Sequence, residues 1–477
     1  MDFWIAWAQW LVQGVGYELM LFASVGILLI GIDDLSFDVL WFVRRARQRP
    51  PLAPLGEGPR LNGRIALFVP AWDERRALPA MLRRTLAAWD GHDFRIYIGC
   101  YPNDLGTLRS VSGLVSADHR LRLVVGERDG PTTKGDNLNR LWAAMGADER
   151  SDGMRFAAVV LHDVEDHVHP GELDLYRRLL VDHAMVQIPV VPFVDRAGRW
   201  VGGHYADEFA ETHGKELGLR SELGVPIPSA GVGCALGRGA LALLAIERGG
   251  SPFRADSLTE DYEVGLLIGA YGLRACFADC RDARGERIVS RGPFPVTLEA
   301  AVRQKARWIA GIALAGWAHL GWLASDMTAP GQGWARRWLN RWMLWRDRRA
   351  PLAALIVLAA YAALIFAGLD WIGQRALGWP APDHRGTVDM LLTASAALLI
   401  WRLGMRGHFT ARWYGIREAL FALPRAFIAN VIAILAARRA LSTYWRMWRS
   451  GKVVWDKTAH DENMQRPQPA PARGRLP

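Results

Sequence analysis

Apolar and polar positions divide the chain into an apolar beginning, a middle of short alternating elements and an apolar last third. Between Asp2 and Asp33 the only charged residue is Glu18. Because a helix of about 20 apolar residues crosses a bilayer, the beginning predicts a membrane span near Val15–Ile32. The preceding Phe3–Leu11 carries three Trp, which favours a position in the membrane interface.

The last third predicts two further spans. Pro351–Leu369 is uncharged throughout, and Val388–Trp401 is a shorter apolar run. A third run, Ala419–Ala437, contains a Pro, an Arg and an Asn, so it fits either a span or an interfacial helix. If the middle of the chain and its end are both cytoplasmic, the number of spans after residue 308 is even. This parity favours two spans and an interfacial Ala419–Ala437.

Between these apolar regions, buried-strand patterns alternate with stretches of helical spacing. Such alternation is typical of an α/β domain with a mostly parallel sheet, which binds ligands at the carboxyl ends of its strands. The predicted strands are Ile65–Val69, Phe94–Gly99, Leu121–Val125 and Ala157–Leu161, and the predicted helices are Leu78–Trp89 and Lys134–Met145.

These patterns predict a catalytic domain inserted between membrane segments. The expected divisions are an N-terminal membrane segment (1–49), a Pro/Gly-rich linker (50–59), an α/β domain (60–308), interfacial amphipathic helices (309–349), a C-terminal membrane region (350–440) and a basic cytoplasmic tail with a disordered end (441–477).

Composition and charge narrow the partners. The chain has 22 Trp and a net charge of +10. Trp prefers the bilayer–water boundary, and the Arg residues cluster beside the apolar runs, so the charge is interpreted as facing anionic lipid rather than nucleic acid. By the positive-inside rule, the basic residues after the first span place the α/β domain in the cytoplasm. These residues are Arg44, Arg45, Arg47 and Arg49. The four Cys form no CxxC pair, which fits a reducing compartment.

The strongest local signal is an acidic run, His162–Asp166, directly after a predicted strand. Carboxylates there lie where an α/β sheet opens its cleft. Hard oxygen ligands select Mg²⁺ or Mn²⁺, and such an ion neutralises a departing nucleotide diphosphate. Asp163, Glu165 and Asp166 are therefore candidate metal ligands. Taken alone, the run also fits a solvated acidic turn.

A second signal is the run Ser257–Asp261. A general base must be a carboxylate near the acceptor hydroxyl, and Glu260 and Asp261 are candidates. The structural alternative is a capping box, in which Ser257 and Glu260 start a helix over Tyr262–Tyr271. The two interpretations are compatible, since a helix N-terminus also fixes a catalytic acid firmly.

A third signal is Gln304–Trp308, which reads QxxRW. Gln304, Arg307 and Trp308 lie within about one helical turn, so they can face one cleft. Arg offers a fork of donors to a diphosphate, and Trp offers an apolar face to a sugar ring. An amphipathic helix at the membrane interface is the alternative.

In chain order these signals read DxD, TED and QxxRW, and they precede a membrane region. The chain thereby resembles the bacterial membrane-bound glycosyltransferases of family 2, which include the cellulose and hyaluronan synthases. Further phrases narrow the resemblance to the transferase part of the phage-adsorption group of this family. These phrases are Phe68–Glu74, Tyr101–Asp104, Lys134–Asn139, Leu161–Asp166 and Trp455–His460.

The resemblance implies a GT-A-like, Rossmann-like fold and a role for each matching position. It implies nucleotide binding for Pro70, Asp73, Glu74, Asn103, Asp104, Lys134 and Asp136. It implies metal–diphosphate binding by Asp163 and Glu165, although Glu165 replaces the usual second Asp and Asp166 follows it, so the choice of ligands stays open. Asp261, beside Glu260, is implied as the base. On the QxxRW helix with Gln304, Arg307 would touch the diphosphate and Trp308 would shape the acceptor site.

The implied reaction is inverting transfer of a sugar from a nucleotide-diphosphate-sugar, expected to be a UDP-sugar, to a growing exopolysaccharide or other surface glycan. The implied location is the bacterial inner membrane. A partner in the outer membrane could then export the product. Two alternatives stay open: a membrane-anchored metal-dependent phosphohydrolase, and a non-catalytic envelope scaffold or phage-entry factor. The group carries a further cyclic-di-GMP-binding region beyond the transferase, and the resemblance of these 477 residues does not extend to it.

Overall fold

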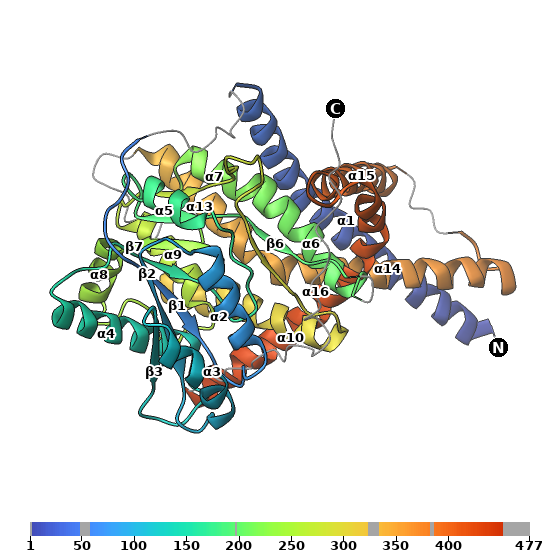
Figure 1. Cartoon of the computed structure of the whole chain (residues 1–477). Coiled ribbons are helices and arrows are strands. Elements are labelled where there is room, and N and C mark those ends of the chain that lie inside the picture. Colours follow the sequence, from blue (N-terminus) through green and yellow to red (C-terminus); the bar gives the residue numbers. More distant parts are fainter. Residues whose placement is uncertain (1, 48–57, 196–197, 323–332, 382–385, 452–477) are drawn as a thin grey trace.

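The structure is a computed structural model that describes residues 2–47, 58–195, 198–322, 333–381 and 386–451. It consists of an α/β domain from the middle of the chain and a group of long helices from both ends (Figure 1). Nearly all of the predicted linker, and the tail from residue 452, lie outside the described residues.

The α/β domain is built on a seven-stranded sheet with the order β3-β2-β1-β4-β7-β5-β8. Only β7 runs antiparallel to its neighbours, so the predicted mostly parallel sheet is confirmed. The strands are β1 Ile65–Pro70, β2 Phe94–Cys100, β3 Leu121–Val125, β4 Ala158–Leu161, β5 Met185–Gln187, β7 Cys234–Gly237 and β8 Ala275–Phe277. A separate pair, β6 Val190–Pro192 and β9 Ser290–Gly292, lies beside the sheet.

Helices cover both faces of this sheet, because its central strands are apolar on both sides. In β1, Phe68 packs on one face with α4 and α8, whereas Leu67 and Val69 pack on the other with α2 and α5. The helices of the domain are α2 Ala77–Ala88, α3 Leu105–Ala117, α4 Lys134–Asp152, α5 Glu172–Leu179, α8 Arg238–Glu247 and α9 Glu260–Ala270. The result is a three-layer sandwich. The edge of the sheet where this architecture binds ligands is formed by the carboxyl ends of β1 and β4.

The start of α9 differs from the prediction. The helix begins at Glu260, two residues earlier than expected, with Thr259 at its N-cap. The predicted capping box between Ser257 and Glu260 is therefore wrong, because Ser257 precedes the cap. Its hydroxyl donates instead to Oε1 of Glu263 over 2.7 Å. Glu260 and Asp261 are left in the first turn, where the helix dipole favours carboxylates.

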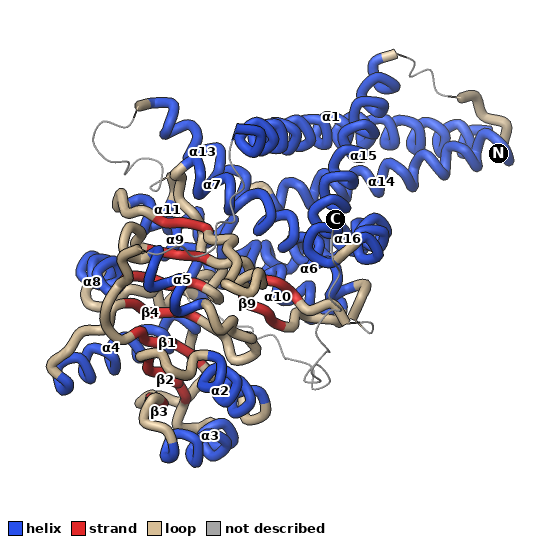
Figure 2. The backbone as a smooth tube through the Cα atoms, turned by 45° about the horizontal axis from the view of Figure 1, so that its top comes forward, coloured by secondary structure: helices blue, strands red, loops and turns tan. Residues whose placement is uncertain are grey.

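Four of the described helices are long and apolar enough to cross a membrane. They are α1 Asp2–Arg47, α14 Ala350–Ala376, α15 Thr387–Tyr414 and α16 Ile416–Ser450. The first is one continuous helix of 46 residues, rather than an interfacial piece followed by a separate span. Figure 2 shows α1 and α14 side by side, projecting away from the sheet. They run antiparallel, since Gly16 meets Phe366 and Gly26 meets Ile356.

Helix α16 packs along α15 and α14, and also along α6 (Val201–Glu211) and α10 (Leu298–Ile309) of the α/β domain. Its Arg425 is fully buried and donates twice to Asp207 of α6, over 2.8 and 2.7 Å. This ion pair explains why a Pro-Arg step inside the apolar run is tolerated. By length and composition α16 also qualifies as a span, and its interfacial placement stays a prediction.

The stretch after residue 308 is predicted to lie at the membrane interface, and its first part also packs within the protein. The helix of α10 continues through the π-helical turn η2 (Ala310–Ala315) into α11 (Gly316–Leu320), and much of it is buried in the protein. Trp322 packs against the main core of the domain rather than outward. Helix α13 (Trp334–Arg348) fits the expected amphipathic pattern better, with Trp334 and Trp338 exposed.

Candidate active site

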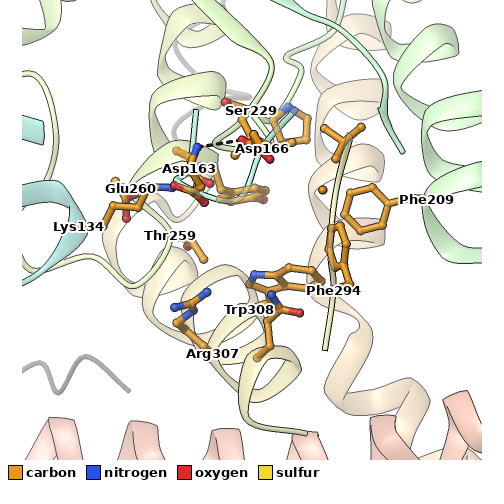
Figure 3. Close-up of a pocket in the computed structure, with 18 of the residues that line it drawn as sticks. Lys134, Asp163, Asp166, Phe209, Ser229, Thr259, Glu260, Phe294, Arg307 and Trp308 are labelled. Atoms are coloured by element: carbon orange, nitrogen blue, oxygen red, sulfur yellow. Dashed lines mark hydrogen bonds and ion pairs between the residues drawn. The ribbon is translucent and has the colours of Figure 1, made fainter. Parts of the chain in front are cut away.

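A cavity of about 380 Å³ opens at the carboxyl ends of β1 and β4. It gathers all three predicted signals, although they come from three separate parts of the chain (Figure 3). The predicted site residues that line it are Pro70, Glu74, Lys134, Asp163, Glu165, Asp166, Glu260, Asp261, Gln304, Arg307 and Trp308. The predicted Asp73, Asn103, Asp104 and Asp136 are not among its lining residues.

One end of the cavity is charged. Asp163 lies two residues after the end of β4, and its Oδ1 lies 2.6 Å from Nζ of Lys134, the first residue of α4. Although burial favours the neutral amine, the charges of Asp163, Glu260 and Asp261 raise the pKa of Lys134. Lys134 is therefore an ammonium held among three carboxylates from two different motifs.

Asp166 has a supporting position beside this end. Its Oδ2 accepts the backbone N–H of Asp163 over 2.8 Å and lies 3.1 Å from Nδ1 of His162, whose Nε2 in turn lies 3.0 Å from Glu172. Burial disfavours the charged imidazole, but Glu172 and Asp166 together raise the pKa of His162 to about 10. A buried cation between two carboxylates thus fixes the loop that carries Asp163.

Glu260 and Asp261 face this charged end from the first turn of α9. Burial, together with the charge of Asp261, raises the pKa of Glu260 to about 7. Burial also raises the pKa of Asp261, against the opposing effect of Lys134. A carboxylate whose pKa is raised toward neutrality is a better general base than an exposed one.

Gly231 lies so close to the carboxyl group of Asp261 that a larger residue would meet it. A Cβ at Gly231 would lie 2.1 Å from Oδ2 of Asp261, and the glycine has a φ of +74°. The resemblance implies that Asp261 is the base of a sugar transfer, so we expect Gly231→Ala to displace its carboxylate and to slow that transfer by about ten- to a hundredfold, since misplacement of a reacting group by 1 Å can cost that much. Transfer per folded molecule is the measurement.

Gly153→Ala is the matched control for that variant. Gly153 also has a positive φ (+66°), but nothing lies within 4 Å of its Cβ position. It should share the backbone strain, which costs about 1–2 kcal/mol, and keep its transfer rate. Equal losses in the two variants would show that strain, rather than contact with Asp261, matters.

The other end of the cavity is aromatic. Gln304, Arg307 and Trp308 lie on α10, and the prediction that they face one cleft is confirmed. In Figure 3, Trp308 lies beside Phe294 and Phe209, whereas Arg307 points toward the charged side. The ring of Trp308 meets that of Tyr205 edge-on, with centroids 5.9 Å apart. Gln304 buries an Oε1 atom without a protein partner among the described residues.

Some of the predicted nucleotide-binding residues line the cavity, and others hold the loops beside it in place. Pro70 and Glu74 line the cavity after β1. Asp104 is buried and has both oxygens occupied, Oδ2 by the N–H of Asp73 (2.7 Å) and Oδ1 by that of Thr107 (3.1 Å). It caps α3 and holds the loop after β1. Its predicted contact with the nucleotide is therefore not apparent from these bonds.

The two remaining nucleotide candidates hold a neighbouring loop together. Asn103 exchanges two hydrogen bonds with the backbone of Gly130, over 2.9 and 2.8 Å. Asp136 accepts from the hydroxyl of Thr132 over 2.7 Å and pairs with Arg128. Both lie on the edge of the domain that carries β2 and α4.

Several lining residues carry no local sequence signal. They are Phe209, Thr212, His213, Ser229 and Phe294. Phe209, Thr212 and His213 come from α6 and the π-helical turn η1 (Thr212–Glu216), and Phe294 follows β9. Only the tertiary fold brings these segments to the cavity, so no motif spacing could have found them.

The strand-end acids fit a divalent cation. Asp163 and Glu165 both line the cavity with hard oxygen donors, which suit Mg²⁺ or Mn²⁺. Asp166 has one oxygen committed to His162 and to the Asp163 backbone. Asp163 likewise has its Oδ1 beside Lys134, so the choice of ligands among Asp163, Glu165 and Asp166 stays a prediction.

Comparison with known proteins agrees with this geometry. A family model described as "Glycosyltransferase like family 2" matches residues 62–311, just over half of the chain. This chain belongs to glycosyltransferase-like family 2. The resemblance predicted from the ordered motifs is thereby confirmed, and the matched segment contains every residue that lines the cavity except Ile312 and Asp347.

The family 2 glycosyltransferase is 32% identical over 470 residues to bacteriophage adsorption protein B of Escherichia coli K12, a match that covers 92% of this chain and 61% of the relative. It matches bacteriophage N4 adsorption protein B of Escherichia coli O157:H7 to the same extent. The chain thus spans less than two thirds of the length of these relatives.

Two solved structures are also similar. A mannosyltransferase of Pyrobaculum calidifontis, in complex with GDP-mannose and Mn²⁺, is 16% identical with a TM-score of 0.48, covering 90% of this chain and 99% of that one. A glucosyl-3-phosphoglycerate synthase of Mycobacterium tuberculosis, in complex with Mn²⁺, UDP and phosphoglyceric acid, is 20% identical with a TM-score of 0.35, covering 58% and 85%.

Proposed function

We propose that this protein transfers a sugar from a nucleotide-diphosphate-sugar to a glycan acceptor, with inversion at the anomeric carbon. The observation that carries the proposal is the convergence on one cavity of Asp163 from the strand end, Asp261 from the α9 terminus and Arg307 with Trp308 from α10. A bare acidic turn, a capping motif and an interfacial helix would have no reason to meet there.

The proposed reaction is a single displacement. The Asp261 carboxylate takes the proton of an acceptor hydroxyl, whose oxygen attacks the anomeric carbon as the bond to the diphosphate oxygen breaks. The nucleotide diphosphate leaves with its negative charge facing Lys134 and Arg307, the two cations that line the cavity within the described chain. A divalent ion held by Asp163 and Glu165 would neutralise further charge on the leaving group.

The proposal also specifies the donor, the acceptor and the location of the protein. The donor is a UDP-sugar, and the acceptor is a growing exopolysaccharide or other surface glycan. The four apolar helices anchor the protein in the bacterial inner membrane, with the α/β domain on the cytoplasmic side, where nucleotide-sugars are made. An outer-membrane partner would then carry the product outward.

Two other functions use only part of the site. A metal-dependent phosphohydrolase needs the charged end but not the aromatic one. An envelope scaffold or phage-entry factor needs neither. The aromatic end of the cavity, built by Trp308, Phe209 and Phe294, therefore favours transfer over both.

Trp308 tests the acceptor end. Its indole face is proposed to pack against the acceptor sugar, and its N–H to donate a hydrogen bond to it. Phe keeps a smaller stacking face and loses the N–H, so Trp308→Phe should lower transfer by about three- to tenfold, the cost of one hydrogen bond. Trp308→Ala should lower transfer much further, because the stacking face is lost. The measurement is transfer per membrane-inserted molecule.

Trp317 is the matched control for that prediction. It lies nine residues later in the same continuous helical segment but outside the cavity, 37% exposed and packed on Trp322 with ring centroids 5.2 Å apart. Trp317→Ala should leave transfer almost unchanged. Equal effects at Trp308 and Trp317 would assign QxxRW to membrane anchoring instead.

A further inference from the structure

One buried polar residue at the aromatic end is not used by the reaction described so far. His213 lies in the π-helical turn η1, is 5% exposed and lines the cavity. π-Helical turns that interrupt α-helices are frequent at functional sites. The turn sits between α6, which carries Phe209, and α7 (Leu217–Leu223).

The hydrogen bonding of His213 fixes its tautomer. Nδ1 accepts the backbone N–H of Val190 over 2.8 Å, so the proton of the neutral ring is on Nε2. Burial lowers the pKa of His213 to about 3, which keeps the ring neutral. Among the described residues no hydrogen bond of Nε2 is found, so this residue of the cavity lining keeps an N–H donor without a protein acceptor.

Aromatic neighbours hold the ring in place. Its centroid lies 5.0 Å from that of Phe209 and 5.6 Å from that of Phe277, and the Phe277 contact is edge-on. Together with the Val190 bond, these contacts leave the imidazole little freedom to turn. A donor that is already oriented loses little entropy when it binds a ligand.

The charges around the aromatic end of the cavity indicate which kind of ligand can bind there. The described cations that line the cavity, Lys134 and Arg307, serve the charged side (Figure 3). Glu208 lines the aromatic side but is paired with Lys305. A phosphate group seated against Phe209 and Phe294 would therefore lack an unpaired cation, whereas an uncharged sugar would find a stacking surface and a fixed donor.

We infer that the aromatic end is a subsite for an uncharged sugar ring of the acceptor, and that Nε2 of His213 donates a hydrogen bond to one of its hydroxyl groups. The inference rests on the proposed glycosyl transfer and names the chemical class of its acceptor. It selects a neutral glycan terminus over a lipid phosphate.

Two substitutions separate the donor from the fold. In His213→Asn the amide oxygen can still accept from Val190 while the donor into the cavity is lost. In His213→Gln the longer side chain returns an N–H to the place of Nε2. The control is His204→Gln, a buried histidine of α6 that does not line the cavity. Unfolding temperatures of all variants of the full-length protein are recorded beside their kinetics.

The assay uses the nucleotide-sugar that the wild type turns over, with neutral oligosaccharides and polyprenyl phosphate as competing acceptor probes. We expect neutral oligosaccharides to be used, and His213→Asn to raise the acceptor KM by about three- to tenfold, well beyond its effect on the donor KM. His213→Gln should recover part of that loss, and His204→Gln should match the wild type.

Preference for polyprenyl phosphate, or an unchanged acceptor KM in folded His213→Asn, would overturn the subsite and leave the proposed transfer standing. Equal rises of donor and acceptor KM would overturn it too, since they indicate a general distortion. A wild type that turns over no nucleotide-sugar at all would overturn the proposed function, and the subsite with it.

Discussion

Asp163→Ala is expected to lower sugar transfer more than about a hundredfold, because stabilisation of a departing diphosphate by a bound ion is worth several kcal/mol. Asp163 lies at the end of β4 with a partly exposed side chain that contacts Lys134. The protein should therefore stay folded. Transfer rates at saturating Mn²⁺, beside an unfolding curve, measure both parts of this expectation.

Asp174→Ala serves as the control for the loss of a carboxylate. Asp174 lies on α5 in an exposed ion pair with Arg60, away from the cavity. Its removal should leave transfer unchanged, since exposed ion pairs contribute little. Near-normal transfer in Asp163→Ala would remove the strand-end acids from the mechanism.

Asp261→Asn is expected to lower transfer by about 10²–10⁴-fold while nucleotide-sugar binding survives, because it keeps the shape of the side chain and removes the proton acceptor. The close surroundings of Asp261 make a substitution of equal size the suitable one: its carboxyl group lies beside Gly231, where a Cβ would come within 2.1 Å of Oδ2. Initial rates and direct measurement of donor affinity separate chemistry from binding.

The pH dependence of transfer gives a second readout for Asp261. A general base must be unprotonated, so wild-type transfer should rise with pH as the Asp261 carboxyl, whose pKa burial raises, loses its proton. Asp261→Asn should lose that acidic limb. A fall in donor affinity in step with the rate would instead make Asp261 a donor-binding or structural residue.

Long apolar strands were predictable from the sequence, and short ones were not. β1 to β4 begin or end within one residue of the predicted runs, because runs of four to seven residues rich in apolar side chains leave a clear pattern. β5 and β8 have three residues each. Three residues carry too little periodicity to separate a strand from a loop, and these two strands exist because β7 and β5 pair them into the sheet.

The site was predictable where chemistry is concentrated in short motifs. Asp163, Asp261 and Arg307 each belong to such a run, and the fold brings all three to one cavity. Motifs do not say which oxygens remain available, however. Asp104 has both oxygens bonded to backbone N–H groups, and Asp166 is held by His162. Those assignments depend on contacts between elements far apart in the chain.

The aromatic end lay beyond sequence reasoning for a different reason. Phe209 and His213 have acidic and Gly neighbours, such as Asp207 and Gly214, but these neighbours form none of the three motifs that point to the site, and neither does the segment of Phe294. Their value comes from position: the helix through η1 and the turn after β9 close over Trp308. An isolated Phe or buried His in a sequence fits a core residue just as well.

Metal-dependent transfer to an acceptor can be tested in a single assay. The purified full-length protein is given a panel of nucleotide-sugars, with and without Mn²⁺ and with and without neutral oligosaccharides. We expect one donor to release its nucleotide diphosphate only when both Mn²⁺ and an acceptor are present, and the new glycosidic bond to have inverted configuration. Acceptor-independent release would indicate a hydrolase, and no turnover with any donor would indicate a scaffold; either result would rule out the proposed function.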